Sequence, residues 1–306
     1  MNRKRIACSS LIAIVAFFSA FICRGAAKED TVDIFTEAAL VKSCVAGETV
    51  EYIVTLYSSS PDVADVTVRK APGFPAELEV AYGTVRNVRP SEVSVKGKTY
   101  YSWPVLRCFV TPKQTGKFTI KGGEFVAVLR KGVVVNDYFW GPRRTYTYEE
   151  KMADCRDSDM KVNPLPDRHR PADFSGCVGD FNIRGWFPPG EIIAGKEAIV
   201  VFTVSGFGSL AGLEIPNISG AFSEGCRLRG IEREDEVSQR EGRLFSETTL
   251  ICRFIPESET GEIGEFSLVF YNPETETYET VSSLPLSWNG HASRRRDVTP
   301  REVFEI

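Results

Sequence analysis

The chain has 306 residues, of which 42% are hydrophobic and 25% are charged, the composition of a soluble globular protein of about two domains. It is therefore neither a disordered chain nor a multi-pass membrane protein. A formal charge of −4 provides no net positive field for nucleic acid, and only two histidines, His169 and His291, are available for acid–base or metal chemistry.

The first 27 residues have the pattern of an export signal. Basic residues at positions 3 to 5 precede the apolar run Ile6–Cys23, and small residues then form a cleavage site that ends at Ala27. Two alternatives stay open. The run reaches the lower limit for a bilayer span and would serve as an uncleaved anchor, or Cys23 is lipidated, although its preceding residue is not the small one that lipidation prefers. Each predicts that the rest of the chain is exported, into the periplasm or anchored facing it.

After residue 27 the chain alternates short β-type runs with turn residues and keeps no helical stripe. Val50–Leu56 alternates apolar and polar residues, as a half-buried strand does. Tyr100–Val110 is a second strand, in which Pro104 predicts an edge or a bulge. Glu124–Leu129 continues the series, and Lys131-Gly132 predicts a turn into the next strand. The first half is therefore expected to be all-β.

The second half repeats landmarks of the first. Residues 46–48, Ala-Gly-Glu, precede a strand, as residues 194–196, Ala-Gly-Lys, do. Tyr, Ser, Leu, Cys and Pro within 101–112 match Phe, Ser, Leu, Cys and Pro within 245–256 without a gap. The alternative is that any two sandwich strands look alike, but several aligned landmarks favour an internal repeat.

We therefore predict an all-β protein with two tandem immunoglobulin-like β-sandwich domains after the signal segment. The expected division is a signal or anchor over 1–27, domain 1 over 28–160, a proline-rich linker over 161–172, domain 2 over 173–290 and a charged tail over 291–306.

Short motifs in both halves carry a family resemblance. Phe174–Phe181, Phe-Ser-Gly-Cys-Val-Gly-Asp-Phe, follows the linker, and Ser205–Leu210, Ser-Gly-Phe-Gly-Ser-Leu, follows a strong strand. With the Pro-x-x-x-Gly-x-Phe turn over 112–118, the chain resembles the BatD, or aerotolerance-type, family of exported bacterial proteins from roughly residue 32 to 288. Cys177 and Ser209 stand where that family usually has Ala and Asn.

The resemblance implies a non-catalytic, extracytoplasmic adaptor or scaffold in a cell-envelope system for oxygen or stress tolerance. Its expected partners are envelope proteins, namely von Willebrand A-domain membrane proteins linked to a MoxR-type ATPase. No catalytic residue, cofactor or metal comes with the family. Longer relatives continue into a transmembrane helix, whereas this sequence stops at Ile306, so membrane contact is expected only through the N-terminal segment or partners. The alternatives are a carbohydrate- or small-ligand-binding module and an adhesion or chaperone-like module.

One candidate partner surface is a segment rich in aromatic and basic residues near the end of domain 1. It comprises Tyr138, Phe139, Trp140, Arg143 and Arg144. Aromatic residues and arginine are enriched at interface hot spots, so the segment predicts a docking surface. The alternative is a final strand that packs its rings into its own core.

A second candidate is the pair Trp186 and Phe187, which precedes two prolines and a glycine. Prolines cannot donate hydrogen bonds to a sheet, so this turn is expected to be at least partly exposed. The pair is then either a docking knob or an apolar plug that closes the end of the sandwich.

Six cysteines follow the signal segment, and an exported protein is able to pair them as disulfides. The alternative is that each is a free, buried thiol. The sequential pairing would join Cys44 with Cys108, Cys155 with Cys177 and Cys226 with Cys252.

The remaining charged clusters favour solvated surface over chemistry. The acidic residues around Asp157 and Asp159 lack the further ligands of a calcium loop, so no metal site is expected. The charged run Glu232–Glu241 is interpreted as an exposed hairpin or edge strand. Neither histidine stands in a catalytic motif, and no phosphate-binding glycine loop occurs, so the chain is not expected to be an enzyme.

Overall fold

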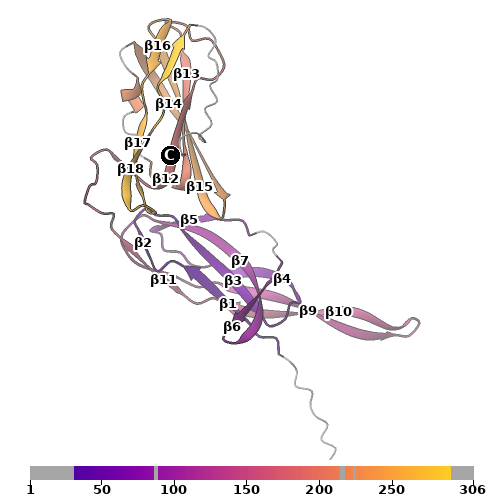
Figure 1. Cartoon of the computed structure of the whole chain (residues 1–306). Coiled ribbons are helices and arrows are strands. Elements are labelled where there is room, and N and C mark those ends of the chain that lie inside the picture. The colour runs from indigo at the N-terminus through magenta and orange to yellow at the C-terminus, as the bar shows by residue number, and fades with distance from the viewer. Residues whose placement is uncertain (1–30, 86–88, 214–217, 223–224, 291–306) are drawn as a thin grey trace, which may run out of the picture. The chain divides into compact units, whose positions relative to one another are not determined.

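The computed structural model describes residues 31–85, 89–213, 218–222 and 225–290. Their regular elements are all β-strands apart from one 3-10 turn, η1 (Ile218–Ala221), so the predicted all-β class is confirmed (Figure 1). Among them no helix is long and apolar enough to span a membrane. The predicted signal segment and charged tail lie outside the described residues.

The N-terminal strand group lies between Ile34 and Asn163 and forms three sheets. Its sheet orders are β1-β3-β7-β5, with β6 also on β7, then β10-β9-β4, and β2-β11-β8. Its strands are β1 (Ile34–Leu40), β2 (Ser43–Val45), β3 (Val50–Ser58), β4 (Val63–Lys70), β5 (Leu78–Tyr82), β6 (Ser91–Val95), β7 (Lys98–Pro112), β8 (Gly116–Ile120), β9 (Glu124–Asp137), β10 (Gly141–Asp154) and β11 (Ser158–Asn163).

Strand β3 shows why the alternating pattern folds as predicted. Its residues Val50, Tyr52, Val54 and Leu56 are buried, while those between them face outward or lie half-buried. The bulge predicted at Pro104 is present, because the pairing of β3 with β7 skips one residue beside that proline. Tyr52 and Phe125 are fully buried in the main core of this group.

The C-terminal strand group lies between Phe174 and Asn289. A six-stranded sheet has the order β14-β15-β13-β12-β17-β18, and β16 pairs with β19. Its strands are β12 (Phe174–Trp186), β13 (Ala198–Ser209), β14 (Cys226–Arg240), β15 (Arg243–Pro256), β16 (Thr260–Ile263), β17 (Ser267–Asn272), β18 (Thr277–Ser282) and β19 (Leu286–Asn289). Its own core contains Phe202, Phe254 and Phe266.

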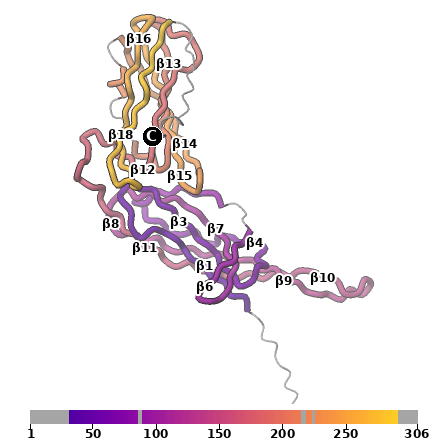
Figure 2. Tube along the Cα trace, in the orientation of Figure 1, coloured from indigo at the N-terminus to yellow at the C-terminus, as the bar shows by residue number. Residues whose placement is uncertain are grey.

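Every strand pair in the described part of the chain joins two strands of the same group, and residues 164–173 between the groups contain no strand. Strand β11 continues to Asn163, three residues beyond the predicted end of domain 1, because Lys161–Asn163 pairs in parallel with Ser43–Val45. Figure 2 shows the course of the chain through the two groups.

The predicted repeat has a counterpart in the hydrogen bonding. Gly47 and Gly195 both adopt a positive φ, at 86° and 72°, which favours glycine. The amide of Gly47 donates to the carbonyl of Pro112, and that of Gly195 donates to the carbonyl of Pro256, each at 2.8 Å. The aligned glycines and prolines of the two halves therefore make the same contact.

Candidate functional site

The site begins with a long hairpin. Strands β9 and β10 pair antiparallel from Glu124 opposite Asp154 to Asp137 opposite Gly141. Strand β4 accompanies β9 only as far as Leu129. Residues 130–148 therefore form a two-stranded ribbon, called the arm below, which extends away from the other strands of its group (Figures 1 and 2).

The prediction of a turn at Lys131-Gly132 is wrong. Lys131 pairs with Thr147 and Gly132 with Tyr146, so β9 continues without interruption through both residues. Gly132 needs no positive φ here. The cross-strand partners on β10 lie far along the chain, and they override the local preference of a Lys-Gly pair for a turn.

The tip of the arm is a three-residue loop, Tyr138–Trp140, closed by its flanking residues. Asp137 accepts hydrogen bonds through Oδ1 from the backbone amides of Phe139, at 2.9 Å, and of Trp140, at 3.1 Å. Gly141 has a φ of 73°, the left-handed conformation that such hairpin loops require. The side chains of Tyr138, Phe139 and Trp140 are 94%, 84% and 79% exposed.

This placement decides between the two interpretations of the segment. The aromatic rings do not pack into a core, so the core-strand alternative is wrong. The reason is topological: the loop lies beyond the end of β4, where no third strand or opposing sheet covers the ribbon. The rings are exposed as a docking surface requires, and the docking itself stays a prediction.

The arm and its base also gather most of the exposed apolar side chains. Of the 15 large hydrophobic residues that are exposed in the described chain, eight lie on β9, β10 or their loop. The eight are Val134, Val135, Tyr138, Phe139, Trp140, Tyr146, Tyr148 and Met152. A concentration of exposed apolar side chains of this kind marks interaction sites.

One face of the arm combines aromatic and basic residues. Val134, Tyr146 and Tyr148 share this face with Arg130 and Arg144, because cross-strand pairs alternate between faces. The guanidinium of Arg130 lies over the ring of Tyr146, 4.9 Å from its centre.

The arm is basic in an acidic chain. Four basic residues and one acidic residue give 130–148 a charge of +3, against −4 for the whole chain. Arg130 pairs with Asp62 at 3.2 Å, and Lys131 pairs with Glu149, whose pKa is lowered by that hydrogen bond.

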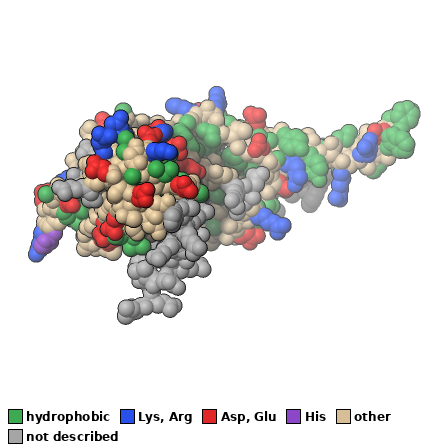
Figure 3. All heavy atoms as spheres, turned by 90° about the horizontal axis from the view of Figure 1, so that it is seen from above, with side chains coloured by type: hydrophobic (Ala, Val, Ile, Leu, Met, Phe, Trp, Pro, Cys, Tyr) green, Lys and Arg blue, Asp and Glu red, His purple; other side chains and the backbone are tan. Residues whose placement is uncertain are grey.

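The two arginines beside the tip differ from those at the base of the arm. Arg143 approaches Asp137 at 4.0 Å, whereas Arg144 has no ion pair with any residue that the structure describes. The positive charge that remains available to a partner is therefore concentrated beside the aromatic tip. Figure 3 shows green apolar atoms at the far end of the arm with blue basic side chains behind them.

The second candidate pair lies elsewhere and is not exposed as a docking knob. The ring of Phe187 packs against those of Phe254 and Trp288, with ring centres 6.2 Å apart in both cases. Trp186 is half-buried at the end of β12, where it pairs with Val201. The prediction that Phe187 is an exposed docking residue is therefore wrong. Its ring packs against the C-terminal core, as the plug alternative describes, because the large neighbouring rings give it apolar contact.

All six cysteines after residue 27 are free thiols in the structure, and five of them are buried. None of the sequential disulfides is present. Cys44, Cys108 and Cys155 belong to one core cluster. Burial raises the pKa of Cys44 and of Cys252 to about 12. Both thiols are therefore protonated and weakly nucleophilic at neutral pH.

The acidic residues near β11 are used for local hydrogen bonds. Asp157 accepts from Lys121 Nζ at 2.7 Å and from the amide of Gly122 at 2.9 Å, and Asp159 accepts from Thr119 at 2.6 Å. The hydrogen bond from Lys121 lowers the pKa of Asp157. Within the described ranges no three acidic, histidine or cysteine side chains gather as a metal site would need.

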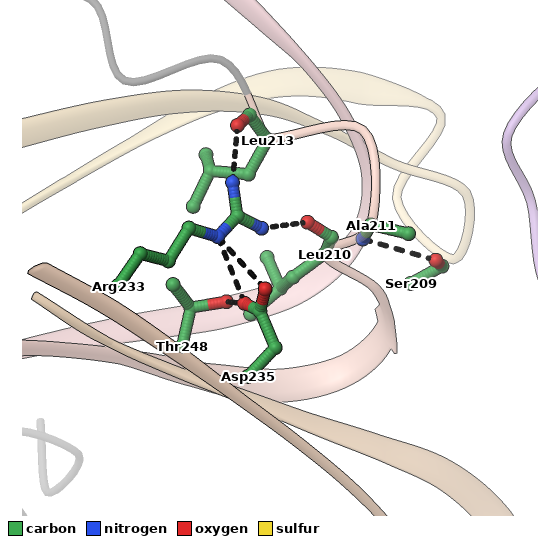
Figure 4. Close-up of polar contacts among 7 residues, drawn as sticks. All are labelled: Ser209, Leu210, Ala211, Leu213, Arg233, Asp235 and Thr248. Carbon is green, nitrogen blue, oxygen red and sulfur yellow. Dashed lines mark hydrogen bonds and ion pairs between the residues drawn. The ribbon is translucent and has the colours of Figure 1, made fainter.

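A polar cluster that the sequence did not indicate holds a turn in the C-terminal group (Figure 4). Arg233 donates to the carbonyls of Leu210 and Leu213, each at 2.9 Å, and through Nε to both carboxylate oxygens of Asp235. Thr248 donates to the same carboxylate at 2.7 Å. Strand β14 is an edge strand, as its charged sequence predicted, but Arg233 in it is a clamp on the turn after Ser205–Leu210.

Fold and site together define an all-β protein of mainly antiparallel sheets, from which an aromatic, basic hairpin projects. No protein-family model matches the chain, and no curated protein is significantly similar to it.

Proposed function

We propose that the protein is a non-catalytic, extracytoplasmic adaptor of the BatD type, built from two immunoglobulin-like sandwiches, that binds cell-envelope proteins through its arm. The resemblance in the motifs of both halves supports this assignment. The partners that it implies are von Willebrand A-domain membrane proteins of a MoxR-linked system.

The observation that carries the proposal is the pair of strand edges along the arm. Beyond Leu129, no third strand among the described residues covers either side of the ribbon. A two-stranded ribbon is at best marginally stable in water, and an edge with apolar side chains invites pairing with another chain. A partner that adds a strand satisfies the backbone groups of the edge and gives pockets for alternate side chains.

The competing function is a carbohydrate- or small-ligand-binding module, which the exposure of Trp140 keeps open. Sugar-binding modules of that kind need a flat aromatic platform. The rings of Tyr138 and Phe139 meet edge to face, with their planes 85° apart, so they form no such platform. The geometry of the tip therefore favours a protein adaptor over a glycan-binding module.

The test is crosslinking and copurification from native membranes with a shortened arm. In the variant, residues 131–147 are replaced by Asn-Gly, which joins the paired residues Arg130 and Tyr148 by a two-residue hairpin turn. The variant keeps β4, the lower halves of β9 and β10, and the core beneath them, so its melting temperature checks that it folds.

We expect von Willebrand A-domain proteins to be recovered with the full-length arm and lost with the shortened one. A matched control is Leu284→Ser, which removes an apolar side chain, 65% exposed, away from the arm; it should recover the same proteins as the unmodified chain. Equal recovery with the shortened arm would refute binding through the arm, and their absence from every sample would refute the adaptor function.

A further inference from the structure

Resting on this adaptor function, we propose that the tip of the arm enters the interfacial layer of an anionic phospholipid bilayer. Tyr138, Phe139 and Trp140 contact the boundary between headgroups and acyl chains, and Arg143 and Arg144 contact lipid phosphates. The arm thereby meets membrane-embedded partners at the bilayer surface. The sequence alone predicted membrane contact only through the N-terminal segment or the partners. The present proposal adds the tip of the arm as a further point of contact.

The composition of the tip fits this environment. Three consecutive aromatic residues are largely exposed, and no groove among the residues that the structure describes receives them. Tyrosine and tryptophan have an apolar body and a polar end, and both are enriched where proteins cross the membrane–water interface. In water, by contrast, the three rings stay mostly exposed, although those of Tyr138 and Phe139 touch edge to face.

Backbone amides of the tip already have hydrogen-bond partners within the loop, which suits a layer that holds little water. Unsatisfied amide groups are costly in an apolar medium. The amides of Phe139 and Trp140 donate to Asp137, so two of the backbone donors at the tip have an internal partner. The same bonds fix the loop before it binds, which lowers the conformational entropy lost on insertion.

The charges lie where headgroups would meet them. Arg143 and Arg144 follow Trp140 by three and four residues, which corresponds to about 10 Å along a strand. Arg144 lacks an ion pair among the described residues, and Arg143 has only the 4.0 Å approach to Asp137. Because the whole chain is acidic, attraction to an anionic surface must come from such a local group of arginines.

Strand β1 also begins near the base of the arm. Asp33 forms two hydrogen bonds with Ser59. Three residues after Ser59, the carbonyl of Asp62 accepts a hydrogen bond from the amide of Arg130, the first residue of the arm. Ile34 belongs to the same small apolar cluster as Ala127 of β9. The chain enters its first strand and the arm leaves the sheets at one end of the N-terminal group.

The sequence before Asp33 has a length that suits a shared bilayer. Nine residues separate the apolar run Ile6–Cys23 from Asp33, and they span at most about 33 Å when extended. From Arg130 to Tyr138 the arm extends about 26 Å. If the run is kept as an anchor, its bilayer is therefore within reach of the tip, and if it is cleaved the tip supplies contact of its own.

The inference is tested by flotation of the exported chain, residues 28–306, which contains every described strand and core cluster. The chain is mixed with vesicles of phosphatidylcholine alone or with phosphatidylglycerol added. We expect binding to the anionic vesicles, with quenching of Trp140 fluorescence by brominated lipid that Trp140→Phe abolishes.

Two multiple variants separate the tip from its arginines. Serine at all three aromatic positions of the tip should lower partitioning at least about 30-fold through the lost apolar burial. Glutamine at both Arg143 and Arg144 should lower it about 25-fold on anionic vesicles, since each basic residue contributes about fivefold. The matched control places serine at three exposed apolar residues off the arm, Tyr82, Val237 and Leu284, and should leave partitioning within about twofold of the unmodified chain.

The outcomes separate this inference from the adaptor function. If the chain recovers its envelope proteins but does not bind anionic vesicles, or if the control variant loses binding as the tip variant does, membrane insertion is refuted and the adaptor stands. A tip that fits only a protein pocket gives the first of these results. Vesicle binding without recovery of any envelope protein leaves the insertion in place and refutes the adaptor.

Discussion

Replacement of Arg233 by glutamine is expected to release the turn that follows Ser205–Leu210. The guanidinium holds two main-chain carbonyls, those of Leu210 and Leu213, at 2.9 Å each. Its side chain is only 27% exposed, so water replaces these bonds incompletely in the variant. The shorter glutamine cannot reach both carbonyls at once.

The magnitude follows from the two carbonyl bonds. Hydrogen bonds from a charged donor contribute about 1.5 to 3 kcal/mol each, and the lower value gives about 3 kcal/mol for the pair. The ion pair with Asp235 adds little, because that carboxylate is half-exposed. A loss of about 3 kcal/mol increases the population of the open turn about 100-fold.

Hydrogen exchange of the Leu213 amide is the assay. This amide donates to the carbonyl of Leu210 at 3.0 Å, inside the turn that Arg233 clamps. Its exchange should accelerate about 100-fold in the variant while amides in the centre of β13 keep their rates. The control is Arg227→Gln, an exposed arginine of the same strand that forms no ion pair within the described chain. Unchanged exchange at Leu213, or equal acceleration in the control, would show that Arg233 does not hold the turn.

Two further predictions concern the strand contacts. Gly206→Ala would place a Cβ 2.0 Å from a main-chain oxygen of the neighbouring strand, so the free energy of unfolding measured in urea should fall by about 3 kcal/mol. In the control Gly230→Ala the new Cβ meets open space, so the free energy of unfolding should stay close to that of the parent. Equal stability of the two variants would contradict this steric argument. Asp157 has its pKa lowered by the hydrogen bond from Lys121, so the bond stabilises the fold above the ordinary pKa of a carboxyl and is lost as the pH falls through the lowered value. The melting temperature of the parent should therefore exceed that of Lys121→Met at neutral pH and converge with it in acid, and a constant difference across this range would exclude the linkage.

The all-β class was predictable because its signal is local. In β3, buried and outward-facing residues alternate with period two, and this pattern is set by the strand itself whatever lies beside it. The bulge at Pro104 was predictable for the same reason, since proline lacks the amide that a regular ladder uses. The equivalent turns at Gly47 and Gly195 were predictable too, because a left-handed backbone strongly favours glycine.

The candidate site was predictable only in composition. The sequence indicated that Tyr138–Trp140 and the two arginines belong together, but not whether the rings lie in a core or in solvent. The same limit applied to Phe187, which the structure places against Phe254 and Trp288. Aromatic residues serve both core and interface, so their exposure depends on which other strands cover them.

The sequence by itself therefore determined the all-β class and the bulge at Pro104, since each is written in neighbouring residues. The repeat and the export-like N-terminal pattern stay predictions. Only the tertiary structure decided that β9 passes straight through Lys131-Gly132, that β4 ends at Leu129, and that a bare ribbon projects beyond it. It also decided that Arg233, within a charged run, clamps a turn more than twenty residues earlier. These features depend on pairings between residues far apart along the chain, which no local pattern encodes.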